Sequence, residues 1–268
     1  MALTDGEVRA AAALLSSERL SEFLRITGTD RDAIALHHQT MRVGAALMPV
    51  TGMMEIMLRN AICERLSQTF AKPDWLAHPP SPFAWKSEQL AHLKQAGNWA
   101  RRAAYSKLTQ AEKRALDAKA FPTGIPAGIS HEMHSKKRQK AVDITTGQLV
   151  AQLTLFFWKR LFSPDYDATL WQRSLRKLFP NKSLSRTQIS AHLETLYQTR
   201  NRIAHHEPVM GSRLVRVIDA ADFLALNFQT KAATEDGILA KMTAPYRTSL
   251  ATEAVALGAL LSKFTVAP

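Results

Sequence analysis

Apolar residues recur every three or four positions along most of the chain, which is the pattern of amphipathic helices. Helical segments are expected at residues 5–15, 17–26, 30–70, 86–105, 110–119, 149–161, 171–179, 185–208, 213–229 and 247–264. Glycine is sparse, and no Asn-Gly or Asp-Gly pair is flanked by the alternating apolar residues of a hairpin. The sequence therefore predicts an all-α protein, a helical bundle with additional helices in one domain over residues 1–268.

Proline and glycine indicate where the helical pattern should be interrupted. Pro49 and Gly52 are expected to break or kink the long segment 30–70. Residues 121–128 contain two prolines and two glycines, and the dense basic run 136–140 follows. We expect a long basic loop at about 120–146, which either has a function or is an ordinary solvated surface loop.

The charge balance favours an anionic partner. The chain has 35 Lys and Arg residues against 23 Asp and Glu, a formal net charge of +12. Nucleic acid is the first expectation and an anionic membrane surface the second, although an inert basic surface would give the same charge. Cys63 is the only cysteine, which excludes an internal disulfide and a cysteine-rich zinc site and fits a reducing cytosol.

The hydropathy pattern predicts neither a signal peptide nor a membrane-spanning helix. Residues 1–7 are acidic and lack the apolar h-region of a signal peptide. The apolar stretch from Leu149 to Phe157 is interrupted by polar residues and is too short to span a bilayer. We expect a cytoplasmic protein that makes no membrane contact.

The segment 200–208, Arg-Asn-Arg-Ile-Ala-His-His-Glu-Pro, is the strongest candidate for a functional site. On a helix, Arg200, Asn201 and His205 are expected to lie close to one face. Arg202 and His206 are expected to form a separate pair four residues apart on a neighbouring face. The site is therefore expected at the C-terminal end of the helix that begins near residue 185.

These residue types suit the cleavage of RNA. The planar guanidinium of arginine binds phosphate well, and histidine, with an ordinary pKa of ~6.5, can remove or deliver a proton. Attack of a ribose 2′-hydroxyl on its neighbouring phosphate requires no metal. The spacing alone leaves a structural role open, with Arg200 paired to Glu55 or Glu194 and His205 bound to a carbonyl of the core.

The segment from Arg200 to Glu207 resembles the signature of the Abi-like abortive-infection family, which belongs to the HEPN superfamily. The motif of that superfamily is arginine, a polar residue, and histidine after four to six intervening positions; here four residues separate Arg200 from His205. Four further segments are similar to the same family, namely 55–62, 148–158, 166–171 and 175–180. The resemblance extends from about Ser16 to Pro208. Met54 stands where the family often has leucine, a conservative change in volume.

The resemblance implies a HEPN helical bundle and a metal-independent endoribonuclease that acts as an abortive-infection or toxin-like defence effector. It implies a homodimer in which two Arg–His motifs face each other, and it allows an antitoxin partner. No cofactor is expected. Members of the family that only bind RNA or another protein share the fold, so a non-catalytic module is the alternative.

Individual roles follow from this resemblance. The expected catalytic residues are Arg200, Asn201 and His205. The expected supporting residues are His206 and Glu207, together with Glu55, Arg59 and Asn60 from the segment 55–62. A simple ion pair between Glu55 and Arg59 along their helix is the alternative for those two side chains.

Contact with the RNA backbone is expected from a separate basic set, because each phosphate contact adds to salt-dependent affinity. That set consists of Lys136, Lys137, Arg138, Lys140 and Arg202. The neighbouring His131-Glu132-Met133-His134 lacks the two histidines four residues apart that a zincin helix carries. No metal site is therefore expected.

Overall fold

The computed structural model describes residues 3–81 and 83–265. Every regular element in these residues is a helix, so the prediction of an all-α protein is confirmed. The α-helices are α1 (Asp5–Leu15), α2 (Ser17–Thr27), α3 (Asp30–Phe70), α4 (Ser87–Ser106), α5 (Gln110–Ala115), α6 (Asp117–Ala120), α7 (His131–Lys140), α8 (Thr146–Ala151), α9 (Leu155–Arg160), α10 (Arg186–Ala204), α11 (Ser212–Asn227) and α12 (Ile238–Thr265). Short 3₁₀ and π-helical turns, η1 (Pro164–Tyr166), η2 (Asp167–Trp171) and η3 (Leu175–Leu178), connect α9 to α10.

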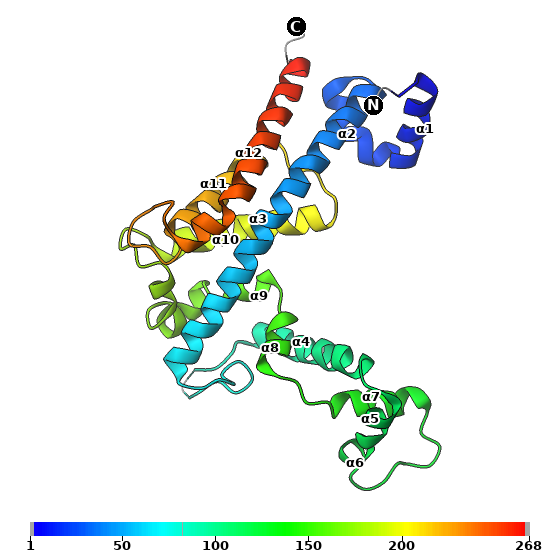
Figure 1. The fold of residues 1–268 in the computed structure, drawn as a ribbon, viewed down its shortest axis with the longest axis vertical. Coiled ribbons are helices and arrows are strands. Elements are labelled where there is room, and N and C mark those ends of the chain that lie inside the picture. Colours follow the sequence, from blue (N-terminus) through cyan, green and yellow to red (C-terminus); the bar gives the residue numbers. More distant parts are fainter. Residues whose placement is uncertain (1–2, 82, 266–268) are drawn as a thin grey trace.

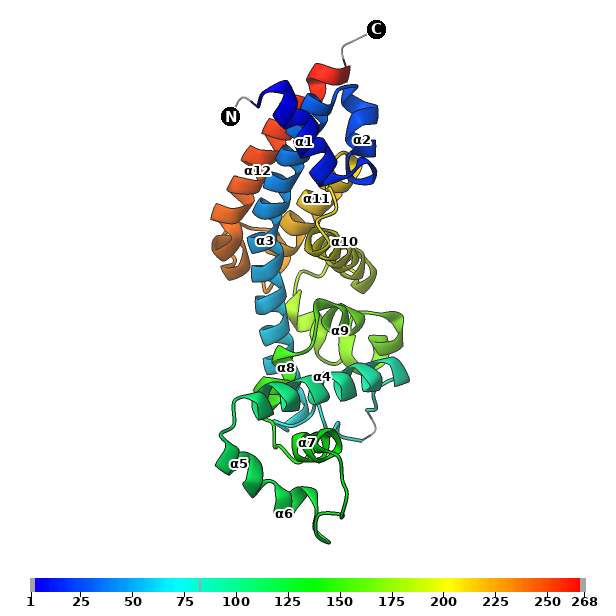
Figure 2. The same ribbon diagram turned by 90° about the vertical axis from the view of Figure 1, so that its right-hand side faces the viewer.

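Helix α3 runs along most of the elongated, bent molecule (Figures 1 and 2). Pro49 and Gly52 were expected to break or kink it, and they do not break it, because the helix is continuous from Asp30 to Phe70. Proline removes one N–H donor from the helix interior, but the buried residues Leu47 and Val50 on either side hold this stretch in the core. Tertiary packing of that kind contributes more to helix stability than local propensity does.

The N-terminal and C-terminal helices both pack against α3. Helices α2, α10 and α12 all pack against α3, and Figures 1 and 2 both show α12 beside its upper half. Helix α12 begins at Ile238 and continues through Pro245, so the expected start at residue 247 is too late.

Among the described residues, α3 is the one helix long and apolar enough to cross a membrane by length and composition alone.

Helices α4 to α8 form the lower arm of the molecule in Figure 1. The segment 120–146, expected to be a long basic loop, contains the ten-residue helix α7. Ser130 caps α7 by accepting a hydrogen bond from the Met133 amide, and Arg138 on α7 donates to the Asp117 carboxylate. The loop expectation therefore holds only for the residues on either side of α7, because a distant carboxylate stabilises a helix that has no apolar face.

An aromatic cluster joins the lower arm to the rest of the protein. Trp75 and Phe83 lie against Trp85, and Trp85 in turn contacts Phe157 of α9. The hydroxyl of Tyr166 accepts from the Lys86 amide at 3.0 Å and donates to Gln89 at 2.8 Å. These buried contacts fix the chain just before α10. The expected helices at 149–161 and 171–179 are each divided here into shorter turns.

Candidate functional site

Helix α10 carries the Arg–His segment, and its sequence explains its start and its orientation. Ser185 and Gln188 form the expected capping box, in which the Ser185 amide donates to the Gln188 side chain at 2.8 Å and the Gln188 amide donates to the Ser185 hydroxyl at 3.2 Å. One face of the helix is buried, at Ile189, Leu193, Leu196 and Ile203. On the opposite face, Thr187, Gln198 and the C-cap residue His205 are exposed.

The helix ends at the site itself, four residues earlier than Pro208. His205 is the C-cap residue, and His206 adopts the left-handed conformation with φ of 55°. The His206 amide donates to the Ile203 carbonyl at 2.9 Å, and the Glu207 amide donates to the Arg202 carbonyl at 2.8 Å. This pair of bonds is the Schellman motif, which normally has glycine at the position of His206.

Arg200 points towards helix α3. Its Nε lies 3.7 Å from Oε2 of Glu55, and the Arg200 side chain is 41% exposed while that of Glu55 is 16% exposed. The distance is that of an ion pair rather than a hydrogen bond. Glu194, the other partner considered for Arg200, is bound instead to Lys159. Glu55 thus holds Arg200 in place while its guanidinium stays accessible.

Asn201 and His205 lie on the solvent face of α10. They are four residues apart, so their side chains project from the same side of the helix. Arg200 and His205 are five residues apart, which places them about 140° apart around the helix axis. The expectation that all three share one face is therefore wrong for Arg200. Within the described part of the chain, no hydrogen bond reaches the His205 imidazole.

A basic pocket of about 420 Å³ lies near the end of α10. Asn201 and Arg202 line it from α10, and Arg213 and Arg216 line it from α11. Arg213 and Arg216 were not among the site residues expected from the sequence. Their spacing of three residues predicts a shared helix face, but nothing in the sequence indicates that this face meets the end of α10.

The remaining expected residues divide into those at the site and those away from it. Arg202 pairs with Glu207 at 2.9 Å across the helix end, and the His206 carbonyl accepts from Arg19 of α2 at 2.6 Å. On α3, Arg59 donates to the side chain of its neighbour Asn60 at 3.3 Å. The described residues contain no ion pair between Glu55 and Arg59.

The basic run of α7 does not join the site. Figures 1 and 2 place α7 in the lower arm and α10 in the upper half of the molecule. Lys136 pairs with Glu132 at 2.5 Å, and Arg138 is held by Asp117, whose pKa the Arg138 guanidinium lowers strongly. Lys137 and Lys140 are exposed. Arg138 therefore has a structural partner, and the run is a separate basic surface.

An apolar pocket of about 480 Å³ lies between α3 and the turn after α10. Met41 and Met48 line it from α3, and Ile203 and Pro208 line it from the other side. Met41, Met48 and Ile56 are large apolar residues of α3 that remain exposed, Met48 by 51%. Exposed apolar patches of this kind mark interaction surfaces in soluble proteins.

The arrangement offers proton-transfer and phosphate-binding groups without a clustered ligand set for a metal. Among residues 3–81 and 83–265, no three His, Cys, Asp or Glu side chains gather into a possible metal site. His131, Glu132 and His134 all belong to α7, where His134 is hydrogen-bonded to Asp117 at 2.7 Å. An exposed imidazole, an amide and several guanidinium groups therefore define the chemistry of the surface at the end of α10.

Comparison of the chain with family models, with curated proteins and with solved structures finds no match in any of the three. The resemblance to the Abi-like family therefore depends on the sequence segments described above, and the function must be argued from the geometry of the site.

Proposed function

We propose that this protein is a metal-independent endoribonuclease of the HEPN type, acting as an abortive-infection or toxin-like defence effector on RNA. The single observation that carries the proposal is the exposed imidazole of His205 at the end of α10, one helical turn after Asn201, which lines the basic pocket of Arg202, Arg213 and Arg216. A proton-transfer group next to a phosphate-binding surface is what cleavage by an internal hydroxyl requires.

The proposed reaction assigns a role to each group. His205, in its neutral form, takes the proton of a ribose 2′-hydroxyl. The 2′-oxygen then bonds to the adjacent phosphorus, the bond from phosphorus to the 5′-oxygen breaks, and a protonated imidazole or a water molecule protonates that oxygen. Arg200, positioned by Glu55, stabilises the charge on the phosphate. Asn201 orients the imidazole or the phosphate through its amide. The products carry a 2′,3′-cyclic phosphate and a 5′-hydroxyl.

A homodimer is part of the same proposal. One imidazole can act as base or as acid in a given step, and Arg200 and His205 of one chain point in different directions. The exposed apolar residues Met41 and Met48 of α3 line a pocket with the turn after α10, Ile56 is exposed further along the same helix, and a second copy of the chain would cover them. Such an interface would bring two Arg–His segments together. Sedimentation of the wild type and of Met48→Glu tests the dimer, which the substitution is expected to dissociate.

The test of the activity is cleavage of a single-stranded RNA in EDTA. Wild-type protein should produce fragments with 2′,3′-cyclic phosphate ends, and His205→Ala should abolish cleavage while its thermal melting curve stays unchanged. His131→Ala is the matched control, because His131 is an exposed histidine of the distant helix α7. Equal activity in His205→Ala and the wild type would refute the assigned role of His205.

The second candidate is a non-catalytic RNA-binding or protein-interaction module. It is favoured by one observation, that the His205 imidazole receives no orienting hydrogen bond within the described residues. This alternative is expected to give salt-sensitive RNA binding with no cleavage at any protein concentration, and Arg213→Ala is expected to weaken binding. Growth arrest on expression, relieved by His205→Ala, would instead favour the toxin and a partner that keeps it silent.

A further inference from the structure

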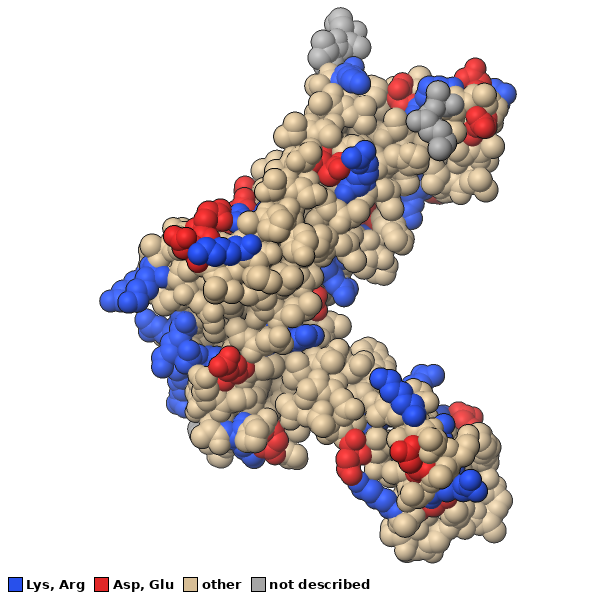
Figure 3. Space-filling model, in the orientation of Figure 1, with Lys and Arg blue, Asp and Glu red and all other residues tan. Residues whose placement is uncertain are grey.

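The connection between η2 and α10 is a basic stretch that lies apart from both the Arg–His segment and the run of α7. Between Asp167 and Glu194 the chain has no acidic residue and five basic ones, Arg173, Arg176, Lys177, Lys182 and Arg186. Figure 3 shows Lys and Arg side chains gathered on the left edge of the molecule over this connection. Neither the motif nor the basic run of α7 accounts for this surface.

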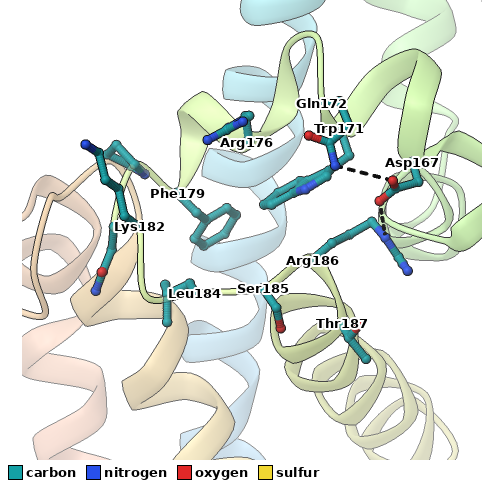
Figure 4. Close-up of a pocket in the computed structure, with 12 residues that line it drawn as sticks. Asp167, Trp171, Gln172, Arg176, Phe179, Lys182, Leu184, Ser185, Arg186 and Thr187 are labelled. Carbon is teal, nitrogen blue, oxygen red and sulfur yellow. Dashed lines mark hydrogen bonds and ion pairs between the residues drawn. The ribbon is translucent and has the colours of Figure 1, made fainter.

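The surface is hollowed into a pocket of about 410 Å³. Arg176, Lys182 and Arg186 line it, and in the view of Figure 4 the rings of Trp171 and Phe179 lie between Lys182 and Arg186. Both rings are buried, so they form a firm apolar floor. The pocket thus combines a rigid base with cations that approach it from two sides.

The charge of the pocket is not neutralised from within. Asp167 is its only acidic lining residue, and Arg186 donates to Asp167 at 2.7 Å and to the Phe162 carbonyl at 2.7 Å. Arg176 and Lys182 are exposed and have no ion pair within residues 3–81 and 83–265. Two free cations beside a compensated carboxylate are suited to bind phosphate oxygens.

The solvent face of α10 connects this pocket to His205. Thr187, Gln198, Asn201 and His205 occupy one stripe of the helix, at successive intervals of eleven, three and four residues. Thr187 lines the pocket, and 18 residues at ~1.5 Å per residue place His205 about 27 Å from it. No uncompensated carboxylate lies along this face of α10 between the pocket and His205, so nothing there would repel a phosphate backbone.

Glu194 is the only acidic residue of α10. Its carboxylate is bound by Lys159, whose ammonium group also lies over the rings of Phe156 and Tyr197. The basic pocket lined by Arg202, Arg213 and Arg216 borders the far end of the stripe. Positive groups therefore stand at both ends of the exposed face, and its one carboxylate is compensated.

We propose that the pocket of Arg176, Lys182 and Arg186 is a second binding site for the phosphate backbone of a single-stranded RNA. It anchors the strand about 27 Å from the bond that is cut. The inference rests on the proposed function for the identity of the strand, and it adds that the substrate must be long enough to reach from His205 to the pocket.

Binding is measured first, in the His205→Ala background, so that the RNA stays intact. The probe is a fluorescent 20-nucleotide RNA, and the readout is anisotropy across a range of salt concentrations. Arg176→Ala/Lys182→Ala is expected to weaken affinity and to reduce the slope of log affinity against log salt by about 1.4, because each single-strand phosphate contact contributes ~0.7. The control Arg9→Ala/Lys263→Ala removes the same two residue types at the opposite end of the molecule, where both are exposed.

Cleavage is measured second, in the wild-type background. Arg176→Ala/Lys182→Ala should lower kcat/KM for the 20-nucleotide RNA and leave it unchanged for a dinucleotide, which cannot span the distance. An unaltered salt slope, or an equal loss in the Arg9→Ala/Lys263→Ala control, would overturn the proposal. So would a loss of binding to phosphatidylserine vesicles with RNA binding intact, since that result assigns the pocket to a membrane. If no RNA is cut at all, the proposed activity fails, while the anisotropy result still decides on the pocket.

Discussion

The left-handed conformation of His206 makes a quantitative prediction about stability. An L-residue with a Cβ in this region costs about 1–2 kcal/mol relative to the right-handed form, and His206 has φ of 55°. Glycine removes that cost but loses about 0.4–1 kcal/mol through the greater freedom of the unfolded chain. His206→Gly should therefore stabilise the protein by about 0.5–1 kcal/mol, which corresponds to a rise of about 2 °C in Tm for a chain of this size.

The assay is thermal unfolding of the wild type, His206→Gly and His206→Ala by circular dichroism. The alanine variant removes the imidazole but keeps the Cβ, so it should show no gain. Ala71→Gly is an independent positive control, because Ala71 ends α3 with φ of 51°. A lower Tm for His206→Gly, or an equal rise for His206→Ala, would contradict the argument that backbone strain is stored at this helix end.

Two further predictions concern buried or half-buried titratable groups. Burial lowers the pKa of His37 and of His192, so below about pH 6.5 the unfolded chain binds protons that the folded protein does not, and stability should fall as the pH falls through that range. Urea unfolding at pH 7.5 and 5.5 should show this loss, and His37→Phe/His192→Phe should reduce it; an undiminished loss in the double variant would refute the assignment. Burial also raises the pKa of the Cys63 thiol to about 11, so little reactive thiolate is present in the folded protein at pH 8. Iodoacetamide should therefore alkylate Cys63 slowly in the native protein and quickly in urea. Rapid labelling of the native protein would show that Cys63 is not protected.

The helical architecture could be predicted from the sequence because it depends on local patterns. The capping box at Ser185 and the apolar spacing after it predict the start and the buried face of α10, and the structure has both. Pro49 was misleading, since its local effect is to break a helix and tertiary packing overrides that effect in α3. Helix α7 was missed for the converse reason, because it lacks apolar periodicity.

The candidate site could be predicted in part. The segment 200–207 was found from residue types and spacing, and the contact of Glu55 with Arg200 was among the expected pairings. The end of α10 at His205 could not be read from the sequence, because the usual glycine at C′ is replaced by His206. Arg213, Arg216 and the pocket at Arg176 depend on how separate elements pack, and local spacing contains no information about that.

The packing of α12 against α3 has a consequence for synthesis of the chain. Helix α3 ends at Phe70 and α12 begins at Ile238, so 168 residues must be added before the first turn of the partner helix exists. At ~5–20 residues per second, the apolar surface of α3 waits roughly 10–30 s on the ribosome for α12 to cover it. We therefore expect chaperones that bind nascent chains to bind newly made α3. A truncation before α12 would leave the apolar face of α3 that contacts α12 permanently exposed.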